Sequence, residues 1–341
     1  MKLPLKIFLA VGLLMIAGRV RACDLCAVYR AADAKGDSGT GFVFTLAQQY
    51  IPYRTVQYNG HEVNPPNPDY VDSSITHFVL GYNGSSRWGV SLNVPFTHLN
   101  FRRTDLRYYS GPPFVEVVTE KGSETGLGDV SLIGRFAILE RTEMDYGYVI
   151  NLLAGVKFPT GDDSRLDEEI DQVRIYDNFL PPNTPHDPLG HSISSVHLHD
   201  LALGSGSYDG IFGVTASANW QRFFFNAQFQ YYLRTEGCSG FKYGDEVMVS
   251  GGPGFFVLLN KSYTLTLQLN AVYDWMARDE LLGTASDATG YTAWYLGPLV
   301  NFTWRSRLSA NVGVDVPLSI DNRGYQSVPD YKLFGGITWR F

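Results

Sequence analysis

One stretch of the chain constrains the fold more than any other, because its side chains alternate between apolar and polar. Ser262–Trp275 places on one face Tyr263, Leu265, Leu267, Leu269, Ala271 and Tyr273. Its other face carries Thr264, Thr266, Gln268, Asn270, Val272 and Asp274. A period of two predicts a strand with one apolar face. The pattern recurs to the end of the chain with aromatic residues near the ends of the apolar face. This is typical of a β-barrel in lipid, where a closed barrel leaves no unpaired backbone edge.

The composition agrees with such a barrel. Charged residues make up 18% of the 341 residues and aromatic residues 14%. Outside the amino-terminal leader, no apolar run approaches the roughly 18 residues that a membrane-spanning helix needs. The net charge of −7 disfavours nucleic acid as a partner. We expect no cofactor.

The amino-terminus has the pattern of a secretory signal peptide. Lys2 and Lys6 precede the apolar segment Ile7–Gly18, and Val20-Arg21-Ala22 offers a cleavage site. Residues 1–22 are therefore predicted to be removed, and residues 23–39 to form a periplasmic tail.

The tail carries a Cys-x-x-Cys pair, Cys23 and Cys26. In an oxidising compartment these cysteines could form a disulfide, Cys23 could carry a lipid anchor, or both could be idle thiols. No histidine follows Cys26, so the c-type haem signature is absent. A disulfide between them would leave Cys238 unpaired.

The same alternation predicts twelve strands. They are expected near residues 40–54, 73–83, 87–103, 127–140, 145–158, 207–219, 221–234, 244–258, 262–275, 290–304, 307–319 and 330–341. Pro298 and Pro317 lie inside two of them, where a proline removes a ladder hydrogen bond. We expect Pro317 at a rim and Pro298 at a bulge.

The lengths of the connections provide an independent test. The connections after even-numbered strands are tight, namely Asn83–Arg87, Glu140–Asp145, Asn219–Arg222, Asn260–Ser262 and Trp304–Arg307. Those after odd-numbered strands are longer, apart from a modest one around Thr235–Gly240. An antiparallel outer-membrane barrel over residues 40–341, with short periplasmic turns and longer extracellular loops, has this alternation. The carboxy-terminal Phe341 resembles the terminal signal that the barrel assembly machinery recognises in bacterial outer-membrane proteins.

Three glycine motifs follow one another along the chain. They are Thr125-Gly126-Leu127-Gly128-Asp129, Gly155-Val156-Lys157-Phe158-Pro159-Thr160-Gly161-Asp162 and Gly204-Ser205-Gly206-Ser207-Tyr208-Asp209. Together they resemble the MetA-pathway-of-phenol-degradation family of outer-membrane proteins, from the third strand to Phe341. The resemblance implies an outer-membrane barrel that passes small aromatic or otherwise hydrophobic compounds.

These motifs lie where strands meet the outer rim of the predicted barrel. Gly126, Gly128, Gly204 and Gly206 would permit sharp bends or close approach of two backbones. Asp129 and Asp209 could cap turns there. We interpret all six residues as structural in the first place, ahead of contact with solute.

The connection from residue 160 to 204 is long enough to be functional or disordered. Its first part is acidic, and we interpret it as a solvated extracellular loop beside lipopolysaccharide. Its second part contains His186, His191, His197 and His199. His197 and His199 are weak candidates for a metal site, because the spacing matches no structural zinc motif. The interpretation we favour is four exposed loop histidines.

Residues on the polar parity are expected to face the lumen. As side chains that contact solute we predict Arg135, Lys157, Asn226, Gln228, Gln268 and Asn270. A role restricted to filling and bracing the lumen is the alternative.

We therefore expect a non-enzymatic outer-membrane channel or transporter for small solutes. Its partners would be outer-membrane lipid, lipopolysaccharide and the assembly machinery. A structural or adhesive barrel without flux is one alternative. A lipid hydrolase is another, since His98 and Asn100 lie on the apolar parity, but no serine accompanies them in the expected pattern.

Overall fold

A computed structural model describes residues 40–143, 145–181, 184–237, 239–305 and 307–341. The predicted signal peptide, the tail with Cys23 and Cys26, and Cys238 lie outside the described residues. Those three predictions therefore remain predictions.

The described residues form a closed antiparallel barrel of twelve strands. Its strands are β1 (Gly41–Tyr58), β3 (Tyr70–Asn83), β4 (Trp88–Tyr108), β6 (Ser131–Thr142), β7 (Tyr146–Lys157), β8 (Asp209–Trp220), β9 (Phe223–Leu233), β11 (Glu246–Leu259), β12 (Tyr263–Met276), β15 (Tyr291–Trp304), β16 (Leu308–Asn322) and β18 (Lys332–Arg340). β1 pairs with both β3 and β18, which closes the cylinder. All twelve predicted strands are present, and the predicted fold class is confirmed.

The alternation of side chains has the orientation that a barrel in lipid needs. The outward Phe223, Leu267 and Val312 are 59%, 50% and 53% exposed. Gln268 and Asn270, on the other parity of β12, are buried inside the cylinder. A soluble sandwich would bury the first set, because burial of apolar surface is what stabilises a fold in water. Here that surface faces outward around the whole wall, which is favourable only against an apolar solvent.

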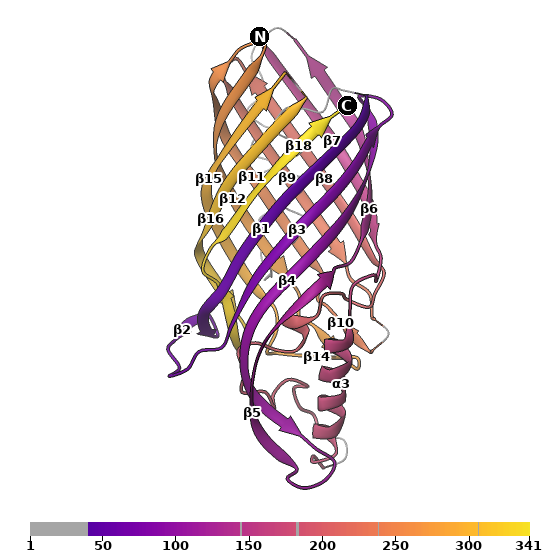
Figure 1. Cartoon of the computed structure of the whole chain (residues 1–341), viewed down its shortest axis with the longest axis vertical. Helices are drawn as coiled ribbons and strands as arrows, with labels where there is room; N and C mark the ends of the chain where they lie inside the picture. The colour runs from indigo at the N-terminus through magenta and orange to yellow at the C-terminus, as the bar shows by residue number, and fades with distance from the viewer. Residues whose placement is uncertain (1–39, 144, 182–183, 238, 306) are drawn as a thin grey trace.

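The two ends of the barrel differ (Figure 1). The end that we call the turn end holds the five tight connections and the carboxy-terminus. The opposite end, the loop end, holds the long connections with their additional elements. The predicted alternation of short and long connections is confirmed. Aromatic side chains such as Tyr82, Trp88 and Trp304 face outward close to the turn end, where a membrane–water interface favours them.

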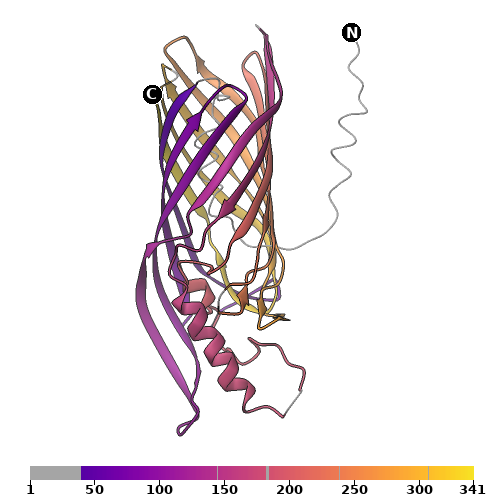
Figure 2. The same cartoon turned by 90° about the vertical axis from the view of Figure 1, so that its right-hand side faces the viewer.

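One hairpin extends beyond the loop end, a feature that the sequence interpretation missed. β4 continues to Tyr108 and pairs over Phe96–Tyr108 with β5 (Val115–Leu127). Nearer the turn end, β4 pairs with β6 instead. β5 and β6 therefore pair in succession with the same strand, β4, and residues 128–130 separate them. Figures 1 and 2 show this hairpin projecting well past the other strands.

The predicted bulge at Pro298 is wrong, because the register does not shift at this residue. Pro298 pairs with Leu269 in an uninterrupted register between β12 and β15. The shift between β15 and β16 lies at the Trp294–Tyr295 step, opposite Pro317 and Ser319. Pro298 is exposed on the outer face. Its missing N–H is tolerated where Gly297 and Pro298 leave a short gap in pairing with β16.

The remaining elements gather at the loop end. They are β2 (His61–Val63), helix α3 (Ser164–Asp177), the 3₁₀ helix η1 (His199–Leu201), β17 (Tyr325–Pro329), and the small sheet of β10 (Phe241–Lys242), β13 (Glu280–Leu281) and β14 (Thr284–Ala285). Among the described residues, no helix has both the length and the apolar character to cross a membrane.

Candidate functional site

The largest cavity that we describe lies inside the barrel and reaches the turn end. Its volume is about 450 Å³. Amide side chains line much of it, together with the aromatic pair Phe224 and Phe256, whose ring centroids lie 5.2 Å apart. A cavity of this size with a few polar groups has the dimensions of a small-molecule site.

Five of the six side chains predicted to contact solute line this cavity. They are Arg135, Asn226, Gln228, Gln268 and Asn270. The Arg135 guanidinium donates to Oδ1 of Asn151 at 3.0 Å and to Oδ1 of Asn83 at 3.2 Å. These bonds hold a single arginine in the lumen wall. Contact with a solute remains a prediction for all five.

The sixth, Lys157, does not line the cavity but belongs to a layer of ion pairs toward the loop end. Its Nζ lies 3.0 Å from Oδ2 of Asp129 and 2.7 Å from Oδ2 of Asp209. Arg234 continues the layer from Asp209 at 3.1 Å to Glu246 at 2.8 Å. Cations and carboxylates thus alternate across this part of the lumen.

A further ion pair and a set of tyrosines complete this layer. Lys332 Nζ lies 2.8 Å from Oδ2 of Asp274 and 4.0 Å from the centroid of the Tyr295 ring. Tyr232, Tyr291 and Tyr295 are buried in the barrel interior. The sequence interpretation placed Asp274 on the polar face of its strand but missed Lys332 and the three tyrosines. The available signal was that β15 carries apolar side chains on both parities near Tyr291 and Tyr295, as a strand buried on both faces does.

The three glycine motifs meet at the loop end of the barrel wall. A Cβ atom on Gly204 would lie 2.5 Å from the carbonyl oxygen of Gly161, so the two backbones pack directly on each other. Gly206 has a φ of +65°, a conformation that favours glycine. Asp129 accepts from the Gly161 and Ser205 amides at 3.0 and 2.8 Å. This joins all three motifs through one carboxylate.

A smaller cavity lies beyond this layer, at the loop end. Its volume is about 180 Å³ and its walls include Tyr53, Val71, Ile75, Leu99 and Leu203. Val196 and Leu201 pack against Val71, Leu99 and Phe101, whose side chains face into the barrel. The second half of the 160–204 connection therefore occupies the loop end of the lumen.

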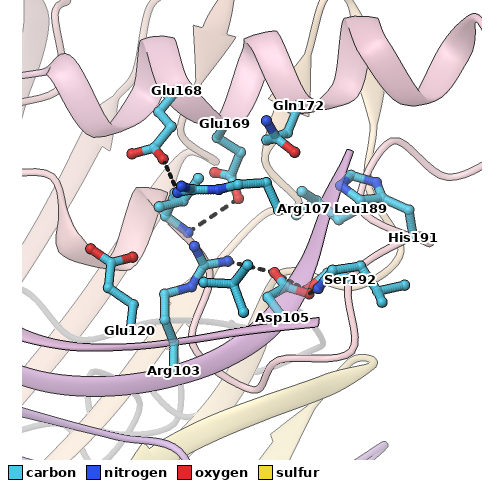
Figure 3. Close-up of a pocket in the computed structure, with 13 residues that line it drawn as sticks. Arg103, Asp105, Arg107, Glu120, Glu168, Glu169, Gln172, Leu189, His191 and Ser192 are labelled. Atoms are coloured by element: carbon cyan, nitrogen blue, oxygen red, sulfur yellow. Dashed lines mark hydrogen bonds and ion pairs between the residues drawn. The ribbon is translucent and has the colours of Figure 1, made fainter. Parts of the chain in front are cut away.

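The acidic first half of this connection is not the solvated loop that the sequence suggested. It forms α3, which buries Leu166, Ile170 and Val173. Figure 3 shows Glu168, Glu169 and Gln172 directed from α3 toward β4, and Glu168 pairs with Arg107 at 2.6 Å. A cavity of about 30 Å³ between the two has room for a water molecule. The spacing of Leu166, Ile170 and Val173 was the available helix signal.

The interpretation of four exposed loop histidines is wrong for three of them. His191, His197 and His199 are buried, and only His186 remains partly exposed, where it pairs with Asp177. Val196 and Leu201 of this connection pack inside the barrel, and the neighbouring histidines are buried as a result.

The environments of His197 and His199 give them different protonation states. Burial, aided by the proximity of His199, lowers the pKa of His197. Burial alone would also lower the pKa of His199, but the carboxylates of Glu169 and Asp200 outweigh it and raise that pKa to about 9. Burial would raise the pKa of Glu169, yet His199 holds it below its usual range. At neutral pH His197 is therefore uncharged, whereas His199 and Glu169 form an ion pair.

The residues considered for a hydrolase do not assemble a triad. His98 faces outward, and its Nδ1 lies 2.6 Å from Oγ1 of Thr125. Within the described part of the chain, no hydrogen bond joins His98 to a serine.

Comparisons with known proteins identify the architecture. No family model matches the chain, and no curated protein matches it. Among solved structures, an outer membrane channel from Pseudomonas putida F1 is similar over 90% of this chain and 99% of that chain, with a TM-score of 0.57 and 14% identity. The β domain of the Bordetella autotransporter BrkA covers 89% and 100%, with a TM-score of 0.44 and 9% identity. The first likeness shows that this fold is a barrel of the bacterial outer-membrane type.

Proposed function

We propose that this protein is an outer-membrane channel through which small solutes, among them aromatic and hydrophobic compounds, diffuse down a gradient. The observation that carries the proposal is the cavity of about 450 Å³ enclosed by a closed barrel whose outer wall is apolar. The similar structure from Pseudomonas putida F1 is described as an outer membrane channel, which agrees with it.

The two cavities suggest the path that a solute would take. The cavity at the loop end is lined largely by apolar and aromatic side chains, and the one at the turn end combines amides and Arg135 with Phe224 and Phe256. The ion-pair layer around Lys157 and Asp209 lies between them. A solute with an apolar body and a polar group matches both linings. The segment around Val196 and Leu201 would have to move for the path to open.

The geometry of the 160–204 connection allows a clean test. The amides of Leu203 and Gly204 donate to the Asp162 carbonyl at 3.0 and 2.9 Å. Residues 163–202 can therefore be replaced by a short Gly–Ser linker without moving the barrel wall. In planar bilayers and liposome-swelling assays with phenolic and aliphatic solutes, we expect this variant to pass more solute than the wild type. Shortening residues 62–68, which lie outside the lumen lining, is the matched control and should leave flux unchanged.

Selectivity provides a second readout. Arg135 is a cation in the cavity wall, so Arg135→Ala should lower the preference for anionic over neutral phenolic solutes. If neither the wild type nor the linker variant passes any solute, the barrel is structural or adhesive and the proposal fails. Outer-membrane location and contact with lipopolysaccharide belong to the same proposal, and fractionation of cells tests them.

A further inference from the structure

A compact set of potential metal ligands lies at the loop end, and one member of it, Glu169, also lines the cavity of about 30 Å³ beside α3. We propose that Glu169, His197 and His199 bind a divalent transition-metal ion such as Zn²⁺. One atom of each residue, a carboxylate oxygen or an imidazole nitrogen, lies within 4.8 Å of the other two. All three residues are buried.

The spacing is close to that of a coordinated ion. Bonds of Zn²⁺ to imidazole nitrogen and carboxylate oxygen measure about 2.0–2.2 Å, so two ligand atoms of one ion lie roughly 3–3.5 Å apart. His199 Nδ1 and Glu169 Oε2 are 2.7 Å apart and share a proton. Replacing this proton by a metal ion needs these two atoms to separate by about half an ångström.

His197 is the residue whose surroundings point to a missing ligand. It is 2% exposed, and among the described residues neither of its ring nitrogens has a hydrogen-bond partner. Its ring stacks on that of His199 at a centroid distance of 5.3 Å and an angle of 24°. Buried polar atoms normally have partners, and an unsatisfied one needs an explanation. Coordination of an ion shared with His199 supplies it.

The donor set selects the class of metal. Two imidazoles and one carboxylate suit Zn²⁺, Cu²⁺, Ni²⁺ or Fe²⁺, whereas Mg²⁺ and Ca²⁺ prefer oxygen ligands alone. Asp200 and Asp279 each place a carboxylate oxygen 3.7 Å from His199 Nε2. Their negative charge favours a cation at this position.

The site would join two parts of the loop end. Glu169 belongs to α3, and its carboxylate already accepts from the amides of Leu198 and His199 at 3.3 and 3.0 Å. Both histidines belong to the segment that packs inside the barrel next to Val196 and Leu201. A bound ion would therefore hold this segment against the helix.

The test uses the full-length chain, purified in detergent and stripped with a chelator. Titration calorimetry with ZnCl₂ is expected to show one site per chain, and MgCl₂ no binding. His197→Ala should weaken Zn²⁺ binding at least tenfold, while His186→Ala, a change in the same connection, should not. Because Cys23 and Cys26 could also bind Zn²⁺, all variants are made with both cysteines replaced by serine.

A spectroscopic readout separates a ligand from a structural residue. Electron paramagnetic resonance of the Cu²⁺ form is expected to show two coupled imidazole nitrogens in the wild type and one in His197→Ala. Folding of each variant is checked by its heat-dependent mobility on gels. The proposal is overturned if folded wild-type protein binds no Zn²⁺, or if His197→Ala retains the wild-type affinity and both nitrogen couplings.

Discussion

At the scale of single residues, the lumen shows how charges are accommodated inside a membrane barrel. Lys157 is 8% exposed and faces the carboxylates of Asp129 and Asp209. Arg234 pairs with Asp209 as well and also with Glu246. A buried charge is expensive unless it is paired and hydrogen-bonded. Because carboxylates alternate with Lys157 and Arg234, each buried charge has a partner of opposite sign. These ion pairs lie where the three glycine motifs meet.

Replacement of Lys157 tests this arrangement. Lys157→Met leaves Asp129 and Asp209 buried beside each other with one cation fewer, so we expect the free energy of unfolding to fall by about 3–5 kcal/mol. Urea unfolding of the barrel in lipid vesicles, followed by tryptophan fluorescence, measures the change. Arg141→Met removes an exposed pair with Glu143 and should not move the midpoint. Equal midpoints for the two variants would show that the buried pairs do not hold the wall together.

At the scale of elements, the β4–β5 hairpin and α3 form a unit outside the regular barrel. Arg165 of α3 bridges to Glu120 at 2.8 Å and to Glu124 at 2.6 Å on β5. It also pairs with Glu168 on its own helix at 2.9 Å. Arg165 thus ties two acidic side chains of β5 to the helix, and the pair of Glu168 with Arg107 of β4 is a second ionic link between the helix and the hairpin.

Removal of this link should loosen the helix. In Arg165→Ala the carboxylates of Glu120 and Glu124 lose the cation that ties them to the helix and repel each other, so α3 is expected to undock more often and residues 164–181 to be cleaved about tenfold faster by proteinase K, because cleavage tracks the open population. Peptide mapping of the products measures the rate. Arg174→Ala, on the same helix, removes only an exposed pair with Asp171 and serves as the control. Equal rates for the two variants would mean that the pairs of Arg165 do not hold α3 in place.

At the scale of the whole molecule, the barrel separates an apolar outside from a polar inside within one residue step. Leu269 and Gln268 are neighbours in β12, yet Leu269 is exposed on the outer wall and Gln268 lines the cavity. The same substitution at the two positions therefore meets opposite environments, lipid at one and a lumen at the other.

This contrast predicts unequal effects of arginine. Leu269→Arg places a charge near the middle of the apolar wall and should lower the free energy of unfolding in vesicles by about 2–4 kcal/mol, whereas Gln268→Arg should cost little because it enters the cavity. Equilibrium folding in lipid vesicles at graded urea concentrations gives both values. A larger loss for Gln268→Arg than for Leu269→Arg would reverse the assigned orientation.

The sequence alone determined the barrel. The alternation that begins with Tyr263 and Leu265 located all twelve strands, since a two-residue period and regularly alternating turn lengths are local properties of the chain. It also placed Arg135 and Asn226 on the inner wall, because the pleat fixes the face of every second residue.

Only the tertiary structure decided what lies at the loop end. The pairing of Lys157 with Asp209, the packing of Gly161 on Gly204 and the meeting of Glu169 with His197 join segments that are distant along the chain. No local period encodes such contacts, and the acidic residues of α3 obscured its apolar face. Burial of three histidines followed from the inward folding of the 160–204 connection, which depends on the shape of the barrel mouth that receives it.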